Sequence, residues 1–321
     1  MWEMSEFAPI VQISYNRANV LHETLLNLAR CEGIQNHDIY AYVDGPRNAA
    51  DSCKVAENVQ VLKNFKGSYL PQMEIIQREY NLGCLKNMYE SVSAVLNRFG
   101  KAIIIEDDIL VSRTFLRYVD AGLRLYAKDK RIWAINGYLD FKMKIKSYYH
   151  HDIFLAPRHS AWGWGTWKDR WEDVDFTLSD FEEFISDTSN LSKINGCGRD
   201  MLPMLRAQYL GRLNTWDVQC TYHMVKNGLF SVRPCLSLVK NIGTGTSCEH
   251  CVQYNVCCAK QKYFNFLPVL ESDIQTDIGL LEKFSRLRDL PCFPLRVLRK
   301  GFHVLRTYLG SENRAPSPCM R

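Results

Sequence analysis

The sequence predicts an α/β fold in which a mixed, mostly parallel sheet is flanked by helices. Four short apolar runs in its first third are typical of strands, and two stripes of apolar residues at helical spacing lie between them. The last run is apolar throughout and rich in isoleucine, as expected for a central strand covered on both faces. Strands that alternate with helices in this way indicate βαβ units. The four runs are Ile10–Ser14, Ile39–Val43, Met73–Gln77 and residues 102–105.

The remaining elements follow from the same patterns. One helical stripe consists of Val20, Leu21, Leu25 and Leu28, and the other of Leu85, Met88, Val92, Val95 and Phe99. The later elements that we expect are a helix over 115–126, a strand over 133–138, an acidic connector with a helix over 175–192, a helix over 216–227 and a strand over 229–239 that Pro234 interrupts. Trp164, Trp167 and Trp171 fall at helical spacing, and we expect Trp167 and Trp171 to lie in the core.

Length and charge indicate one large domain followed by a basic tail. The chain has 321 residues, of which 46% are hydrophobic and 23% charged, as in an ordinary globular protein. We expect a domain over 1–280, made of halves at 1–109 and 110–280, and a tail over 281–321. From residue 282 onward there are nine Lys and Arg against three acidic residues, so the body is nearly neutral. This distribution argues against a general nucleic-acid-binding protein.

The tail mixes Leu, Phe and Val with Arg and Lys over residues 284–309. Basic amphipathic segments of this kind lie on anionic membrane surfaces, and this is the partner that we expect for the tail. A C-terminal amphipathic helix that packs on the body and exposes its arginines is the alternative.

The N-terminal residues lack the features of an export signal, and no run is long enough to span a membrane. The twelve cysteines are therefore expected to be reduced thiols in a cytoplasmic protein. Any contact of this protein with a membrane is expected to be peripheral, on the inner face of the plasma membrane. A metal knuckle is the less favoured interpretation of the late cysteines, because the second pair is adjacent rather than spaced. These cysteines are Cys248, Cys251, Cys257 and Cys258.

Polar residues follow the predicted strands at the point where each one ends. In open parallel sheets, ligands bind at the carboxyl ends of the strands, so we expect these residues to meet in one crevice. Each could also be an ordinary turn. The residues are Tyr15-Asn16-Arg17, Asp44-Gly45, Asn81 with Gly83, and Glu106-Asp107-Asp108.

The three consecutive acids predict a site for Mn²⁺ or Mg²⁺ with room for phosphate oxygens, because carboxylates in this number repel one another unless a cation is present. A solvated turn or helix cap is the alternative. A metal beside phosphates implies a nucleotide: Asp44 would accept the imide N–H of uracil, and Arg17 would lie along the base or diphosphate. The helix that starts near Gly83 would offer its N-terminus to an anion, with Lys86 one turn further on.

Taken together, these motifs resemble the nucleotide-sugar-dependent glycosyltransferases of the GT-A fold, in particular bacterial family-2-like enzymes and the related N-acetylglucosaminyltransferase I. The resemblance covers residues 8–250 and includes several motifs in the second half. In the order of the chain, the motifs are Ile13-Ser14-Tyr15-Asn16-Arg17, Tyr42-Val43-Asp44-Gly45, Asn81-Leu82-Gly83, Ile105-Glu106-Asp107-Asp108, residues 161–167 with Trp162-Gly163-Trp164, Trp216-Asp217, residues 228–234 and Lys240-Asn241-Ile242-Gly243.

The resemblance implies a role for each matching position. Asp108 would bind the metal, Glu106 and Asp107 would serve the ribose and water-mediated contacts, Asp44 the uracil and Arg17 the base. His250 is the candidate for a late histidine near the metal or phosphate, although a histidine in a surface loop is the alternative. The first half, 1–109, would bind the nucleotide and the second, 110–280, the acceptor.

The resemblance also implies an inverting, metal-dependent transfer of a sugar from a UDP-sugar to a glycan or lipid-linked acceptor in surface polysaccharide (LPS or capsule) synthesis. Asp217 is the expected general base, because an attacking hydroxyl must lose its proton. The family has a second acid where this chain has Val218, and a first-turn acid of the helix is the alternative for Asp217. Trp162, Gly163 and Trp164 would line the acceptor pocket.

Two other functions compete with this one. A sugar-nucleotide pyrophosphorylase-like nucleotidyltransferase has similar acids, but it is expected to carry a glycine-rich loop after the first strand, where this chain has Ser14-Tyr15-Asn16-Arg17-Ala18-Asn19. A non-catalytic glycan-binding protein would use the tryptophans but would need neither Asp44 nor the acids.

Overall fold

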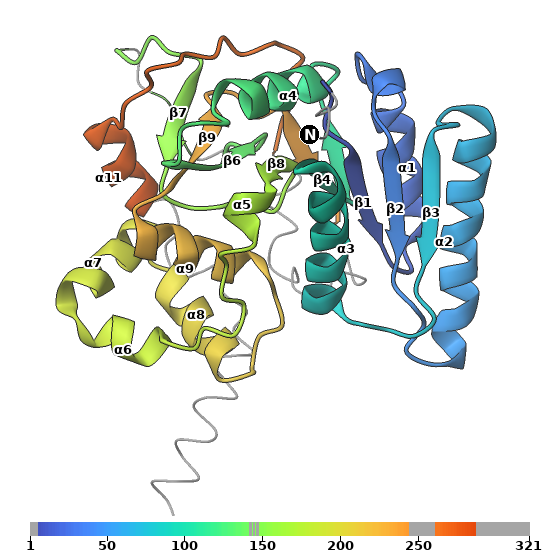
Figure 1. The fold of residues 1–321 in the computed structure, drawn as a ribbon, viewed down its shortest axis with the longest axis horizontal. Coiled ribbons are helices and arrows are strands. Elements are labelled where there is room, and N and C mark those ends of the chain that lie inside the picture. The colour runs from blue at the N-terminus through green and yellow to red at the C-terminus, as the bar shows by residue number, and fades with distance from the viewer. Residues whose placement is uncertain (1–5, 141–142, 144, 146–147, 244–260, 287–321) are drawn as a thin grey trace, which may run out of the picture.

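The computed structural model describes residues 6–140, 143, 145, 148–243 and 261–286. Its main sheet has eight strands in the order β3-β2-β1-β4-β8-β6-β9-β7 (Figure 1). A separate pair joins β10 to β5. Neighbouring strands are parallel from β3 to β4 and between β6 and β9, whereas β8 and β7 run antiparallel to their neighbours. The mixed, mostly parallel sheet that the sequence predicts is confirmed.

The first half follows the predicted alternation of strands and helices. Its 3-10 turn η1 comprises Ile34–Asn36, and its other elements are β1 (Ile10–Ser14), α1 (Ala18–Leu28), β2 (Ile39–Val43), α2 (Ala49–Ser68), β3 (Met73–Gln77), α3 (Cys84–Phe99) and β4 (Lys101–Glu106). The apolar strands β1, β2 and β4 are almost entirely buried, which explains their lack of polar alternation.

The second half is more irregular. Its strands are β5 (Ile109–Val111), β6 (Ile132–Asn136), β7 (Ile153–Ala156), β8 (Trp164–Trp167), β9 (Phe230–Pro234) and β10 (Val239–Asn241). Its helices are α4 (Phe115–Leu125), α5 (Lys168–Trp171), α6 (Phe181–Ser186), α7 (Thr188–Gly196), α8 (Met201–Tyr209), α9 (Asp217–Asn227) and α11 (Ile278–Arg286). Helices α6 to α9 lie together at one end of the molecule (Figure 1) and pack around their own apolar cluster.

Two apolar layers cover the sheet. One contains Leu21 of α1, Val55 of α2 and Leu116 of α4 against buried side chains such as Ile103 of β4. The other contains Met88 of α3, Cys220 of α9 and four tryptophans. The tryptophans of this layer are Trp133, Trp164, Trp171 and Trp216.

The helical spacing of the tryptophans is misleading. Trp164 and Trp167 lie on β8, which pairs antiparallel with both β4 and β6, and only Trp171 lies on a helix, α5. All three are buried, so the prediction that Trp167 and Trp171 belong to the core is confirmed, whereas the helical interpretation is wrong.

After the undescribed residues 244–260, the chain runs without helix or strand over residues 261–277 and then forms α11. The Tyr126 hydroxyl donates to the Glu271 carbonyl at 2.6 Å, and the Thr114 hydroxyl to the Phe266 carbonyl, so this segment is fastened to both ends of α4. Leu280 and Phe284 of α11 are buried against Met143 and Phe154. The rest of the predicted tail, 287–321, lies outside the described residues. No helix in the described part of the chain is both long and apolar enough to cross a bilayer.

Candidate active site

Four strand ends bring the predicted site residues to one edge of the sheet. β1 pairs in parallel with β2 and β4, with Ser14 opposite Val43 and Ile13 opposite Glu106. The residues that follow these strands therefore emerge side by side, at what we call the carboxyl edge. Contacts between Arg17 and Asp107, and between Asp44 and Asn81, confirm that residues distant in sequence meet there.

Arg17 binds two of the three consecutive acids Glu106, Asp107 and Asp108, which we call the acidic triplet. Its Nε donates to Asp107 Oδ2 at 3.2 Å, Nη2 contacts Asp107 Oδ1, and Nη1 lies 3.0 Å from Asp108 Oδ2. Burial raises the pKa of the Asp107 carboxyl to about 6 although the Arg17 charge opposes this shift. The guanidinium is thus committed to carboxylates here, whereas the sequence placed it along a base or diphosphate.

Glu106, the last residue of β4, connects the two halves of the chain. The indole N–H of Trp216 donates to Glu106 Oε1 at 3.3 Å. Burial, followed by the charges of Asp108 and Asp107, raises the pKa of Glu106 to about 8, and the charge of Asp217 acts in the same direction. Asp217 in the first turn of α9 therefore lies within electrostatic range of the acidic triplet, and the Thr215 hydroxyl donates to its Oδ1 at 2.5 Å.

Asp44 accepts four hydrogen bonds from its own chain. Oδ1 accepts from the Gly45 and Leu82 N–H groups at 2.9 and 2.8 Å, and Oδ2 from Asn81 Nδ2 and the Gly83 N–H, both at 3.0 Å. A carboxylate has about four lone-pair sites, so these donors use all of them. The expectation that Asp44 receives a uracil N–H is not supported, because its oxygens already hold the loop between β3 and α3.

Gly45 explains how that loop comes so close. A Cβ at this position would lie 2.4 Å from the Tyr80 carbonyl carbon, so only glycine lets the two loops touch. Lys86, in the first turn of α3, is more than half exposed and lies 3.8 Å from Glu90. Lys86 was expected to assist an anion at the N-terminus of this helix, and its side chain lies at the protein surface.

The fit of a divalent cation rests on one carboxylate oxygen. Among the described residues no group of three His, Cys, Asp or Glu side chains is arranged to hold a metal. Asp108 Oδ1, however, is buried without a hydrogen-bond partner, and its side chain lies against Gly243. Mg²⁺ bound with a nucleotide commonly uses one or two carboxylates together with phosphate oxygens, so Asp108 fits this role. His250 and the four late cysteines lie outside the described residues.

The three residues predicted to line the acceptor pocket, Trp162, Gly163 and Trp164, lie in different environments. Trp164 has no exposed surface and stacks on Trp133 and Trp216, with ring centroids 5.7 and 5.4 Å away. The prediction that it lines the acceptor pocket is therefore wrong: it supports Trp216 from within the core. Trp162 is partly buried and contacts the Tyr138 ring edge-on. Gly163 is buried with a φ of +62°.

Sequence reasoning missed two parts of the carboxyl edge. The Trp216 indole was not assigned, although it lies next to the expected base. The second part surrounds Asp51 in α2, which accepts from the Tyr15 hydroxyl at 2.6 Å and from Arg47 Nε at 2.8 Å. The Arg47 guanidinium also lies over the Tyr15 ring. The only available signal was the sequence Tyr15-Asn16-Arg17, because Asp51 is a polar residue on the buried face of α2, next to apolar residues such as Val55.

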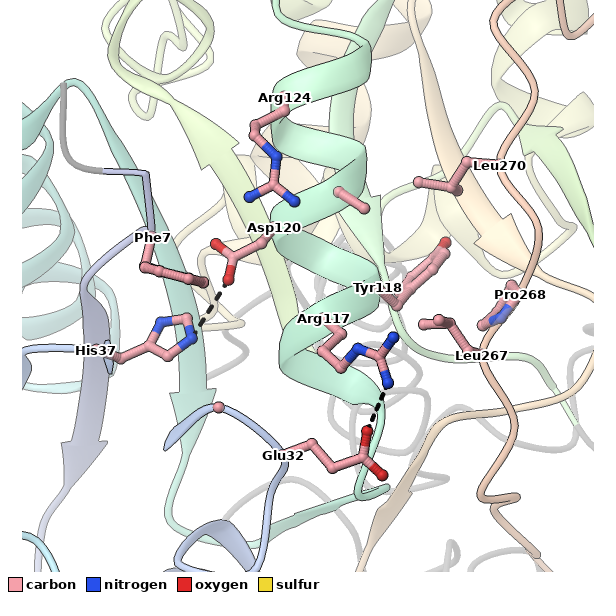
Figure 2. A pocket seen from close by; sticks show the side chains of 12 residues that line it. Phe7, Glu32, His37, Arg117, Tyr118, Asp120, Arg124, Leu267, Pro268 and Leu270 are labelled. Atoms are coloured by element: carbon pink, nitrogen blue, oxygen red, sulfur yellow. Dashed lines mark hydrogen bonds and ion pairs between the residues drawn. The ribbon is translucent and has the colours of Figure 1, made fainter. Parts of the chain in front are cut away.

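A pocket of about 340 Å³ lies elsewhere, between α4 and residues 267–270 (Figure 2). Phe7 and His37 in its wall precede β1 and β2, which places it at the opposite edge of the sheet. His37 Nε2 is 3.3 Å from Asp120 Oδ2, and Nδ1 donates to the Ala8 carbonyl at 2.8 Å. None of the predicted site residues lines this pocket.

Comparison with known proteins gives structural matches only. No protein-family model and no curated protein sequence matches the chain. Residues 1–349 of TarS from S. aureus, solved with UDP-GlcNAc, match at 13% identity and a TM-score of 0.37 over 53% of this chain and 48% of that one. The chain thus spans about half the length of this TarS fragment.

Two further matches have similarly low scores. The mannosyltransferase PcManGT from Pyrobaculum calidifontis, solved with GDP-Man and Mn²⁺, matches at 10% identity and a TM-score of 0.40 over 70% of this chain and 72% of that one. A 4-diphosphocytidyl-2C-methyl-D-erythritol synthase from Anaerococcus prevotii matches at 10% identity and a TM-score of 0.32, over 56% and 78%. Such similarities carry no argument about activity, which depends on the residues at the carboxyl edge.

Proposed function

We propose that this chain is a glycosyltransferase of the GT-A fold that transfers a sugar from a nucleotide-sugar donor, a UDP-sugar, to a hydroxyl of a glycan acceptor. The observation that carries the proposal is the contact between the first half, 1–109, and the second half, 110–280, at the acidic triplet. The acidic triplet ends the nucleotide-binding half, and Trp216-Asp217 of the acceptor half lies against it through the bond between Trp216 and Glu106. A donor and an acceptor that meet at this junction would have acids on both sides of the bond that is exchanged.

The residues divide the chemistry between them. Asp217 takes the proton of the attacking hydroxyl, and the hydroxyl oxygen displaces the nucleoside diphosphate from the anomeric carbon, with inversion. Asp108 is the residue that would hold Mn²⁺ or Mg²⁺ through Oδ1, and such an ion would offset the charge that grows on the leaving diphosphate. Arg17 supplies a second positive charge, which its long side chain can bring to the diphosphate.

Several finer features belong to the same proposal. They are the relation to N-acetylglucosaminyltransferase I, an acceptor used in surface polysaccharide synthesis, and a cytoplasmic location with the tail on the inner face of the membrane. The predicted boundary between a domain at 1–280 and a tail at 281–321 crosses α11, so we propose that the tail begins after Arg286. Trp162 and Gly163 would line the acceptor side of the proposed site, and His250 remains the candidate for a further metal ligand.

The first experiment measures donor hydrolysis and binding. A panel of UDP- and GDP-sugars is incubated with the protein and Mn²⁺, and released nucleoside diphosphate is quantified. We expect hydrolysis of at least one UDP-sugar, and a raised melting temperature with UDP and Mn²⁺. Pyrophosphate formation from UTP and a sugar phosphate would indicate the nucleotidyltransferase, whereas glycan binding without any response to UDP would indicate a glycan-binding protein. Either result would overturn the proposal.

Asp217→Asn tests the assignment of the base. Because a general base contributes about 10²- to 10⁴-fold to a rate, the variant should lose at least about 100-fold in the transfer rate while its affinity for UDP changes less than about twofold. Asp187→Asn is a matched control, since Asp187 also lies at the start of a helix of the second half, where it caps Ser189 of α7. Full activity of Asp217→Asn would remove Asp217 from the mechanism.

A further inference from the structure

Arg17 pairs with two acids of the acidic triplet, Asp107 and Asp108, and occupies most of their oxygens. Three of its nitrogens contact Asp107 and Asp108, and they use three of the four oxygens of these two carboxylates. The fourth, Asp108 Oδ1, is buried and has no partner. Both acids are more than nine-tenths buried, and Arg17 is the one basic side chain of the described residues that forms an ion pair with either.

Hydrogen bonds hold the backbone of both acids in place, whereas the Arg17 guanidinium is held by its contacts with the two carboxylates. The Thr24 hydroxyl donates to the Asp107 carbonyl at 2.7 Å, and the Ile242 N–H to the Asp108 carbonyl at 2.8 Å. The Asp108 carboxylate also lies so close to Gly243 that a Cβ there would come within 2.0 Å of Oδ2. The Arg17 backbone is likewise held, because its carbonyl accepts from Leu21 at the start of α1. Its side chain is long, is one-fifth exposed and is held by its contacts with the two carboxylates, so a stronger anion can draw the guanidinium away while the backbone stays in place.

A divalent cation and this guanidinium compete for the same oxygens. With Arg17 in place, Asp108 Oδ1 is the one oxygen of these two carboxylates that an ion could use, and the ion would lie within a few ångströms of another positive charge, which would repel it. A diphosphate offers Arg17 a different anionic partner, and guanidinium groups bind phosphate oxygens as well as carboxylates. If Arg17 turns to the diphosphate, the second oxygen of Asp108 and both oxygens of Asp107 become free at the moment when phosphate oxygens arrive to complete the coordination of the ion.

We infer that Arg17 is a resident counter-ion of the acidic triplet that moves to the donor diphosphate and thereby couples metal binding to nucleotide binding. The part of this inference that concerns the donor diphosphate rests on the proposed function. Arg17 acts as a positioning residue for the two carboxylates until the donor binds. The consequence is that the free protein binds Mn²⁺ weakly and the protein with nucleotide binds it tightly, so that the ion is taken up with or after the donor.

The test measures Mn²⁺ binding by the EPR signal of the free ion, with and without UDP. For the unaltered protein we expect UDP to tighten Mn²⁺ binding at least about tenfold. Arg17→Gln should bind Mn²⁺ at least about tenfold more tightly than the unaltered protein when no nucleotide is present, and UDP should add little to it. Arg131→Gln is the matched control, because Arg131 pairs with Asp129 on the surface and should leave both affinities unchanged.

A second variant covers the case in which Arg17→Gln does not fold. Arg17→Lys keeps one positive charge but can make fewer simultaneous contacts, so its nucleotide-free affinity for Mn²⁺ should lie between those of the other two proteins. An affinity in Arg17→Lys, and in Arg17→Gln where it folds, that is equal to or weaker than that of the unaltered protein would overturn the inference. Because this comparison uses no nucleotide, its failure is distinguishable from the failure of the protein to bind UDP, which would overturn the proposed function.

Discussion

At the residue scale, Asp44 shows how a residue at the expected place can have a different role. Its four hydrogen bonds are all made within the chain, three of them to backbone N–H groups that follow β2 and β3. If the carboxylate were neutralised, the donors that face one of its two oxygens would lose a good acceptor, and the remaining bonds would no longer be charge-assisted. A ligand that depends on the loop between β3 and α3 would then be affected through the shape of the loop, even without contact to Asp44.

Asp44→Asn should therefore destabilise the free protein. The amide NH₂ would face donors that now meet a carboxylate oxygen, and the loss of charge-assisted bonds costs about 1.5–3 kcal/mol in the free energy of unfolding. Urea unfolding measures this, and amide exchange at Leu82 and Gly83 should become faster. Asn81→Ala, which removes one of the four donors, should cost less. A variant with unchanged stability and weakened UDP binding would instead restore the role in uracil recognition.

The carboxyl edge could be predicted from the sequence because strand ends of a parallel sheet meet by geometry alone. Arg17, Asn81 and the acidic triplet needed only the strand assignments. The pairing of Arg17 with Asp107 could not be predicted, because it depends on the direction of a long side chain. The burial of Trp164 could not be predicted either, since a Trp-Gly-Trp motif has the same letters whether its rings face a pocket or stack on Trp216.

At the element scale, the predictions succeeded where apolar residues form a short run or recur at helical spacing. Strands β1 to β4 and helices α1, α3 and α4 follow such patterns. Helix α2 was missed because its exposed positions carry many charges and its buried ones include Asp51 and Asn58. The tryptophans of β8 were not recognised as part of a strand, because a spacing of three is compatible with a helix and only pairing with β4 and β6 identifies the strand.

The turn before α6 permits a prediction about pH. Asp175 accepts from the backbone N–H and hydroxyl groups of Thr177 and Ser179, at 2.6–2.8 Å. Burial raises the pKa of Asp175, but these four bonds outweigh it, so the pKa lies below its usual range. The same turn holds Leu178 at a φ of +57° with its side chain buried. The carboxylate therefore stabilises a backbone conformation that leucine rarely adopts.

Asp175→Asn should lower the free energy of unfolding at pH 7 by about 1–3 kcal/mol. The sign follows from linkage: the contribution of an acid with a lowered pKa is complete above the unfolded pKa of about 3.9 and is lost as the pH falls below it. The difference between Asp175→Asn and the unaltered protein should therefore shrink between pH 7 and pH 3, as measured by urea unfolding at both values. A difference that is the same at both pH values would show that the charge of Asp175 does not stabilise the turn.

At the scale of the whole molecule, the site exists because the two halves share one sheet. β8 of the second half pairs with β4 of the first, and the tryptophan stack behind it holds Trp216 against Glu106. A change in the stack can therefore act on the acidic triplet without touching it. Helix α9 carries Asp217, and its Cys220 packs in the same apolar layer as the tryptophan stack, so one layer of the core positions both sides of the proposed site.

The last prediction concerns the end of the chain. Phe284 is buried against Phe154 and lies beneath the Arg233 guanidinium, so α11 is part of the body as far as Arg286. A protein that ends after Arg286 keeps the whole of α11 and is the reference for a shorter one. A protein that ends after Leu280 loses Phe284 and should be less stable by about 3–5 kcal/mol, the usual cost of removing a buried phenylalanine side chain.

The truncation after Arg286 also tests the proposal that the tail binds a membrane, because it leaves α11 and the rest of the body intact. If the basic residues beyond 286 bind anionic lipid, the protein that ends after Arg286 should no longer sediment with vesicles that contain phosphatidylserine, but should still hydrolyse its UDP-sugar at the rate of the full chain. Vesicles of neutral lipid are the control, because they should bind neither protein. Equal sedimentation of both proteins with the anionic vesicles would place any lipid-binding surface on the body, since the shorter protein retains all of it and lacks only the tail.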